Sequence, residues 1–154
     1  ASARVVREWQ ENLKGFKGMN IKDMADNVND LVNKKRYITD SKNWGKSDYW
    51  ATPVEFLERG GDCEDFAIMK YTALRSLGVP EERLRLAIVQ DLQKNIPHAV
   101  LVVYTDSGAY ILDNQIKRMI SAERGSRYRP IYSINRTAWW LHSAPKATII
   151  ASAQ

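Results

Sequence analysis

The only cysteine of the 154-residue chain, Cys63, lies in a segment whose residue types suit covalent catalysis. The segment reads Gly60-Gly61-Asp62-Cys63-Glu64-Asp65, and apolar residues at helical spacing follow it. The spacing predicts Cys63 in the first turn of a helix, where amide dipoles stabilise a thiolate and lower the pKa of the thiol. A buried, inert cysteine is the common alternative, but two glycines and three carboxylates make this segment too polar for a simple core position. We interpret Cys63 as a candidate nucleophile.

A nucleophilic thiol needs a base, and the chain has two histidines, His98 and His142. His98 opens a continuous apolar run, typical of a central strand, and Asp113 closes the strand expected after a turn at 105–108. An antiparallel hairpin closed at this turn would place His98 and Asp113 side by side on one face. The carboxylate would then fix the imidazole tautomer and stabilise its charged form. We predict a catalytic triad of Cys63, His98 and Asp113, and we interpret His142, which has no acidic partner nearby in sequence, as structural or surface-lying.

Three carboxylates flank the candidate nucleophile, and negative charge beside a thiol raises its pKa. In one interpretation they only cap the helix, with Asp62 as the N-cap and Asp65 at the third helical amide. In the other, the clustered oxygens of Asp62, Glu64 and Asp65 bind a hard cation such as calcium, whose charge would offset the repulsion. The spacing is not that of an EF-hand, and it leaves both interpretations open.

The first half of the chain has apolar residues at helical spacing, and the second half has strand patterns. Helices are predicted at about 5–16, 21–32, 52–59 and 62–77, and strands at about 84–88, 99–104, 109–112, 131–134 and 138–141. Helices followed by a meander of strands indicate an α+β fold with an antiparallel sheet. Residues 33–51 are expected to form a loop whose aromatic residues wall a cleft or cover the core: Tyr37, Trp44, Tyr49 and Trp50.

Composition and charge narrow the class of protein. A chain of 154 residues with 44% hydrophobic and 27% charged residues is expected to form a single domain spanning 1–154. Its longest apolar runs are too short for a membrane span. The chain opens on Ala1-Ser2-Ala3-Arg4 without a signal peptide, which indicates either a cytoplasmic protein or one whose export signal has been removed.

The net charge of +5 and the sequence pI near 9.4 come largely from basic residues late in the chain, among tyrosines and tryptophans. Such a mixture can grip nucleic acid. The chain shows no nucleic-acid-binding motif, so we expect no nucleic-acid partner. We interpret the segment as a solvated basic face, or as one that meets an acidic protein.

Three blocks of sequence resemble one known family. They are Trp50-x-Thr52-Pro53-x-Glu55-Phe56-Leu57 followed by Gly60-Gly61-Asp62-Cys63-Glu64-Asp65-Phe66-Ala67, then Pro97-His98-Ala99-Val100-Leu101, then Leu112-Asp113-Asn114. In this order they resemble the bacterial transglutaminase-like cysteine proteinases. The resemblance covers most of the chain and shows no departure at the candidate catalytic positions.

This resemblance implies a papain- or transglutaminase-like α+β fold with a Cys63, His98 and Asp113 triad. It implies calcium held by Asp62 and Glu64 first, and by Asp65 to a lesser extent. The implied activity is calcium-dependent cleavage of a large cell-surface adhesin near its N-terminus, which releases the adhesin and disperses a biofilm. The implied regulator is the periplasmic part of an inner-membrane receptor for cyclic di-GMP, which inhibits the protease. The implied location is the periplasm.

Two other functions stay open. A true transglutaminase would pass the acyl group to a lysine amine instead of water, and the triad does not distinguish the two reactions because acceptor choice depends on the shape of the cleft. A binding module that keeps the triad by descent is the second alternative, and the intact set of three residues argues against it.

Overall fold

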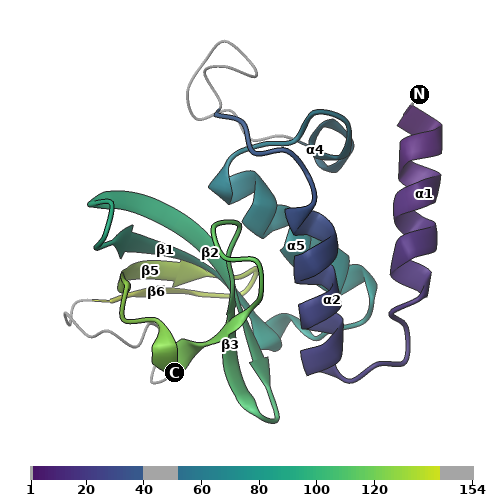
Figure 1. Cartoon of the computed structure of the whole chain (residues 1–154). Helices are drawn as coiled ribbons and strands as arrows, with labels where there is room; N and C mark the ends of the chain where they lie inside the picture. The colour runs from purple at the N-terminus through teal and green to yellow at the C-terminus, as the bar shows by residue number, and fades with distance from the viewer. Residues whose placement is uncertain (1, 40–51, 143–154) are drawn as a thin grey trace.

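The structure, a computed structural model, describes residues 2–39 and 52–142. Within these residues four α-helices come first and a six-stranded antiparallel sheet follows. Figure 1 shows the helices gathered on one side of the sheet, with α1 (Ser2–Lys14) outermost. This is the α+β class that the sequence predicts. In the described ranges, none of the helices has the length and hydropathy needed to cross a membrane.

The first two helices follow the two apolar stripes of the sequence. α1 is joined by a short turn to α2 (Ile21–Asn33). α2 begins where the side chain of Asn20 accepts a hydrogen bond of 2.8 Å from the amide of Asp23, which satisfies one of the amides left unpaired at a helix start. The apolar side of α2 packs against the helix that carries Cys63.

The next two helices both begin with a capping box. α4 (Pro53–Arg59) starts after Thr52, whose hydroxyl accepts from the amide of Glu55 while the Glu55 carboxylate accepts from the amide of Thr52. The same reciprocal pairing starts α5 (Cys63–Ser76), with Asp62 as its N-cap. Both starts are where the sequence predicts them, because a capping box is decided by residues three positions apart.

Six strands form one sheet in the order β4-β3-β2-β1-β5-β6. The strands are β1 (Leu84–Asp91), β2 (Ile96–Thr105), β3 (Gly108–Leu112), β4 (Ile120–Ser121), β5 (Tyr128–Ile134) and β6 (Trp139–Leu141).

The predicted meander is wrong beyond β4, because β5 returns to pair with the outer edge of β1. β4 has two residues and offers almost no ladder for a further strand, whereas β1 offers an eight-residue edge. β2 begins at Ile96, earlier than predicted, so His98 lies inside a strand.

Alternate residues of the sheet face two separate apolar clusters. Leu84 and Leu101 face the helices, and Val89 and Val100 face the opposite side of the sheet, where they pack around the buried Tyr128. Because alternate residues of a strand share a face, His98 shares the face of Val100 and not the face covered by the helices.

The aromatic loop is described only in part. Tyr37 is 52% exposed, and its ring lies 6.2 Å from that of Phe66 at the start of α5. The other three aromatic residues of this loop, Trp44, Tyr49 and Trp50, lie outside the described residues, so their role as the wall of a cleft stays a prediction.

Candidate active site

A tight turn of two glycines leads into Cys63. Gly60 has a φ of +85°, and a side chain there would meet the carbonyl oxygen of Arg36. At Gly61 a Cβ would lie 2.5 Å from the carboxylate of Asp65. The Gly61 amide also donates to the Arg36 carbonyl at 3.1 Å, which holds the turn against the chain leaving α2. The glycine pair is therefore required by a left-handed conformation at one position and by close packing at the next.

Cys63 is the first residue of α5, as its spacing predicts, and its side chain is half-buried. Its sulfur accepts a hydrogen bond from the backbone amide of Ala99, the residue after His98 in β2. β3 pairs with β2 only as far as Leu101, so the edge of β2 before that point is left for the start of α5. The candidate thiol thus lies against the strand residue that follows the candidate base.

The electrostatics of the thiol differ from the prediction. Burial, with smaller contributions from the charges of Asp62 and Glu64, raises the pKa of Cys63 to about 11. Hydrogen bonds from the amides of Ala99 and Glu64 act in the opposite direction. The helix-start amide among these, that of Glu64, acts in the predicted direction, but desolvation of the thiolate outweighs it. The predicted lowered pKa is wrong for the chain by itself, and activation of Cys63 requires a proton acceptor.

The structure brings His98 and Asp113 together. His98 Nε2 lies 2.7 Å from Asp113 Oδ1, and both side chains are buried. The reason differs from the one predicted. The register pairs Leu101 with Leu112, so a continued hairpin would put Gln115 opposite His98. Asp113 reaches the imidazole because it lies just beyond the end of β3, where the chain has left the ladder.

Asp113 is held as a carboxylate. Burial by itself would raise its pKa, but hydrogen bonds from His98, from the Tyr128 hydroxyl and from the Gln115 amide outweigh burial and lower it. An ionised carboxylate can only accept hydrogen bonds, so Nε2 of His98 carries the proton. Nδ1 of the same ring is then the nitrogen that can accept one.

Tyr128 and Gln115 complete the surroundings of the carboxylate. The Tyr128 hydroxyl donates to Asp113 Oδ2, and its ring lies 5.6 Å from the ring of His98. The Gln115 amide donates to Asp113 Oδ1 at 2.9 Å. The orientation of the carboxylate is thus fixed from three sides: by His98, by Tyr128 and by the backbone of Gln115.

A second buried carboxylate, Asp91 at the end of β1, continues this network. Arg127 donates to both of its oxygens, at 3.0 and 2.8 Å. The Gln115 side-chain amide joins Asp91, at 3.2 Å, to the Tyr128 hydroxyl, at 3.3 Å. The Arg127 hydrogen bonds, with those from Gln115 and two backbone amides, hold the pKa of Asp91 well below its usual range.

Sequence reasoning missed this network of Asp91, Gln115, Arg127 and Tyr128. It ended the first strand at 88, three residues before Asp91, and it read Arg127 as part of a basic surface. The available signal was the position of Asp91, which continues the inward alternation of Ala87 and Val89.

A buried lysine, Lys70, interacts electrostatically with Asp113. Lys70 of α5 is 0% exposed, and among the described residues its Nζ has no hydrogen-bond partner. Its Nζ lies 5.9 Å from the centroid of the Phe66 ring. Burial lowers the pKa of Lys70 to about 7, and the charge of Asp113 opposes that shift. Asn33 holds the same segment by donating to the Asp113 carbonyl at 3.1 Å.

The carboxylates beside Cys63 fit a calcium site only in part. Asp62 and Asp65 form the reciprocal capping box, with bonds of 3.2 and 3.0 Å, and Asp65 is 2% exposed. Across residues 2–39 and 52–142, no group of three or more His, Cys, Asp or Glu side chains is placed to hold a metal ion. Asp62 and Glu64 are half-buried and carry the hard oxygens that calcium takes. The capping interpretation accounts for Asp65.

The remaining histidine, which we interpret as structural or surface-lying, is hydrogen-bonded to β5. His142 Nε2 lies 3.1 Å from the Ser133 hydroxyl, and the His142 amide donates to the Ile131 carbonyl at 2.7 Å. These bonds hold the chain at the end of β6 against β5.

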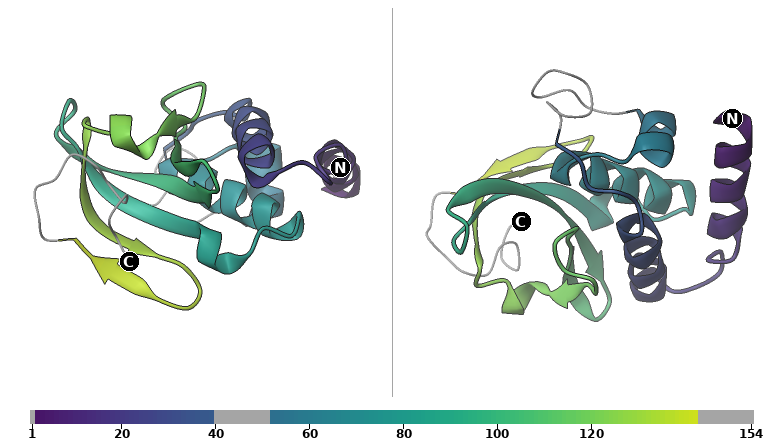
Figure 2. Two further views of the ribbon diagram at one scale, coloured as in Figure 1. Left: turned by 90° about the horizontal axis from the view of Figure 1, so that it is seen from below. Right: turned by 45° about the horizontal axis from the view of Figure 1, so that its top comes forward.

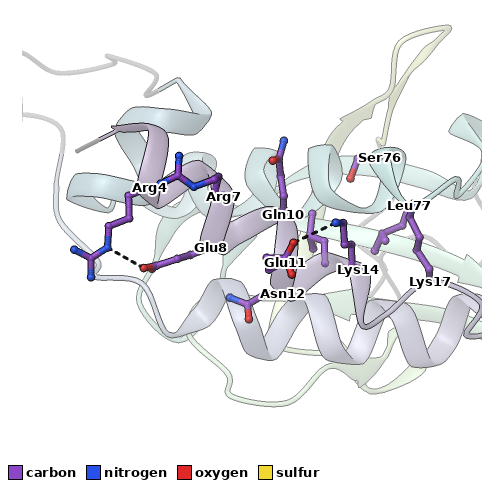
Figure 3. A pocket seen from close by; sticks show the side chains of 11 residues that line it. Arg4, Arg7, Glu8, Gln10, Glu11, Asn12, Lys14, Lys17, Ser76 and Leu77 are labelled. Carbon is purple, nitrogen blue, oxygen red and sulfur yellow. Dashed lines mark hydrogen bonds and ion pairs between the residues drawn. The ribbon is translucent and has the colours of Figure 1, made fainter.

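A broad polar hollow runs along α1 and does not involve the candidate triad. Figure 3 shows its charged lining, with the ion pairs Arg4–Glu8 and Lys14–Glu11 drawn as dashed lines. Both pairs are exposed, and such pairs contribute roughly 0–1 kcal/mol. The residues that line the hollow include no cysteine or histidine.

Comparisons with known proteins agree with the geometry. The family described as bacterial transglutaminase-like cysteine proteinase matches residues 8–146. Calcium-bound Legionella pneumophila LapG is 33% identical, with a TM-score of 0.82 over 97% of this chain and 84% of that one. The EGTA-treated form of the same protein is 34% identical, with a TM-score of 0.82 over 94% and 80%.

A more distant structure, that of a TGase, is 19% identical, with a TM-score of 0.50 over 73% of this chain and 31% of that one. At this identity the likeness is one of fold alone. A search of curated proteins gave no significant match.

Proposed function

Because the chain belongs to the bacterial transglutaminase-like cysteine proteinase family, we propose that it is an endopeptidase with a Cys63, His98 and Asp113 triad. The observation that carries this proposal is the 2.7 Å contact between His98 Nε2 and Asp113 Oδ1, formed beside the residue whose amide touches the Cys63 sulfur. A nucleophile, a base and an orienting acid are the groups that covalent hydrolysis of a peptide bond requires.

The proposed mechanism gives each of these three groups one role. His98 accepts the Cys63 proton as the sulfur forms a bond to the peptide carbonyl carbon, and helix-start amides of α5 stabilise the oxyanion. His98 then donates that proton to the leaving amine as the C–N bond breaks. Water, deprotonated by His98, hydrolyses the thioester and frees Cys63. Asp113 holds the imidazole and stabilises its charged form throughout.

We extend the proposal to calcium, with Asp62 and Glu64 as the main ligands and Asp65 in a lesser part. A similar structure, that of LapG, is calcium-bound. Calcium takes about six to eight oxygen ligands, so these carboxylates would form only part of its shell. A bound ion would supply positive charge beside the thiol whose pKa the two carboxylates raise.

Calcium removal gives two readouts. Chelation is expected to slow cleavage and added calcium to restore it. Calcium is also expected to raise the midpoint of thermal unfolding, because an ion that binds only the folded state stabilises it. Full activity and an unchanged midpoint after chelation would leave the three carboxylates as caps.

The proposed substrate is the N-terminal region of a large cell-surface adhesin, and its cleavage would release the adhesin and disperse a biofilm. The proposed location is the periplasm, and the proposed inhibitor is the periplasmic domain of an inner-membrane receptor for cyclic di-GMP. The resemblance of the three motif blocks supports these assignments.

The experiment is cleavage of an adhesin N-terminal fragment, with calcium and with chelator, by wild type and by Cys63→Ala. We expect two fragments from wild type with calcium and none from the variant. Cleavage by Cys63→Ala would overturn the mechanism.

Mass spectrometry of the products separates the alternatives. A crosslink with loss of ammonia would indicate acyl transfer to an amine. A Cys63 that reacts with no thiol reagent in calcium-loaded protein would indicate a binding module.

A further inference from the structure

A row of apolar side chains crosses the sheet from the candidate active site. The strand registers pair Ala99 with Ile88, Ile88 with Tyr132, and Tyr132 with Leu141. Residues paired directly across antiparallel strands point to the same face. These four residues therefore form a line across β2, β1, β5 and β6, which we call the apolar row.

The apolar row begins at the candidate nucleophile and becomes more exposed along its length. Ala99, whose amide contacts the Cys63 sulfur, is 5% exposed, Tyr132 is 38% exposed and Leu141 is 69% exposed. α5 packs chiefly on β2, and Figure 2 shows β5 and β6 extending away from the helices. Within the described residues, the outer half of the row is an exposed apolar strip.

A hollow lies where the apolar row meets α5. Ile88, Ala99 and Tyr132 of the row line it from the sheet, and Ala67 and Ile68 line it from the helix. Glu64, the residue after the candidate nucleophile, also lines it. The hollow is thus continuous with the start of α5 and mainly apolar.

We infer that this hollow and the apolar row bind an extended segment of the substrate chain next to the scissile bond, with an apolar side chain in the hollow. The inference rests on the proposed function and deepens it. The Cys63 sulfur contacts the amide of Ala99, so the row begins beside the atom that would attack the peptide carbonyl.

The dimensions and chemistry of the row suit such a segment. Adjacent strands lie about 4.8 Å apart, so the row from Ala99 to Leu141 spans about 14 Å, the length of roughly four extended residues. An apolar side chain placed in the hollow leaves water, which favours binding. An acidic side chain at the same place would lose its hydration beside Glu64, a residue of the same charge.

The test compares Tyr132→Glu and Leu141→Glu with wild type on a library of synthetic ten-residue peptides. Met19→Glu is the matched control, because Met19 is 37% exposed and lies in the turn between α1 and α2. Wild type is expected to cut bonds that have an apolar residue within four positions.

For those peptides, Tyr132→Glu should lower kcat/KM about tenfold through KM, since the variant loses the burial of one apolar side chain. Leu141→Glu should lower it less, and Met19→Glu should not change it. A kcat/KM for Tyr132→Glu equal to that of wild type would overturn the inference. A rise in kcat/KM in Leu141→Glu would also overturn it, because it would show that another part of the chain occupies the row.

A binding measurement separates this inference from the proposed function. The same peptides, labelled with a fluorophore, are titrated into Cys63→Ala protein with and without Tyr132→Glu. Binding that Tyr132→Glu weakens supports the inference even if wild type cuts nothing, an outcome that would overturn only the protease. Equal binding by the two proteins, or no binding by either, would overturn the inference.

Discussion

Two buried charged side chains, Asp91 and Lys70, interact with Asp113 or with its network, and they differ in whether they have hydrogen-bond partners. Asp91 accepts five hydrogen bonds, from both sides of the Arg127 fork, from the Gln115 side chain and from two backbone amides. Lys70 has no hydrogen-bond partner for Nζ among the described residues. The first charge is neutralised by a network that reaches Asp113. The second acts on Asp113 only through space.

The Asp91 network contributes to the orientation of Asp113, whereas Lys70 lowers the stability of the folded state. The chain from Arg127 through Asp91 and Gln115 to Tyr128 ends on Asp113 Oδ2, so it helps to hold the acid that holds His98. Lys70 supplies a positive charge near the same acid, but an unpaired buried charge destabilises the folded state. Substitution of Arg127 and substitution of Lys70 should therefore change the free energy of unfolding in opposite directions.

The largest expected effect is a loss of turnover on substitution of Asp113, which interacts with both the Asp91 network and Lys70. Asp113→Asn should lower kcat/KM by roughly a thousandfold or more, because an amide in its place favours the wrong imidazole tautomer. The measurement is steady-state cleavage, with circular dichroism as the check that the variant folds. Turnover near that of wild type would remove Asp113 from the triad.

In the Asp91 network, Arg127→Met should lower the free energy of unfolding by about 3–5 kcal/mol, because it leaves the Asp91 carboxylate buried without its cation. The folded pKa of Asp91 is lowered, so its contribution is present above the ordinary aspartate pKa of about 3.9 and is lost as pH falls. The deficit, measured by urea unfolding, should therefore shrink in acid.

Arg118→Met is the matched control for Arg127→Met, since Arg118 pairs with Asp26 at an exposed site. It should change the free energy of unfolding by about 0–1 kcal/mol. Equal effects of the two substitutions would contradict the contrast between buried and exposed pairs.

At the buried lysine, Lys70→Met should raise the free energy of unfolding by roughly 2–4 kcal/mol near or below pH 7. Folded Lys70 has a pKa of about 7, below the roughly 10.4 of an exposed lysine. The unfolded chain therefore binds more protons between these values, and wild-type stability rises with pH across that window.

The gain from Lys70→Met should accordingly be largest below pH 7 and fade toward pH 10. Lys34→Met, at an exposed lysine, is the control and should stay within about 0.5 kcal/mol of wild type. A loss of stability in Lys70→Met would show that Nζ has a stabilising partner.

The smallest expected effect sharpens the link between the network and the triad. Tyr128→Phe removes one donor to Asp113 and should lower kcat/KM about tenfold, the size of one hydrogen bond to a charged group. In an Asp113→Asn background the same substitution should have little further effect, because the interaction is already altered. Additive losses would show that Tyr128 acts elsewhere.

Local spacing predicted the elements that present the nucleophile. The starts of α4 and α5 follow from Thr52 with Glu55 and from Asp62 with Asp65, pairs three residues apart that interact whatever the rest of the chain does. The glycine turn before Cys63 is equally local. The return of β5 to the edge of β1 escaped prediction because it depends on which of two edges is longer once the sheet has formed.

The sequence by itself determined the helix start that carries Cys63, the strand that carries His98 and the α+β order of the elements, because each depends on residues close together in the chain. Only the tertiary structure decided that Asp113 reaches His98 from beyond the end of β3. It also decided that Tyr128 and Asp91 support that contact, and that burial raises the pKa of Cys63. These features arise from pairings between distant strands and from the exclusion of water, which no local pattern of residues encodes.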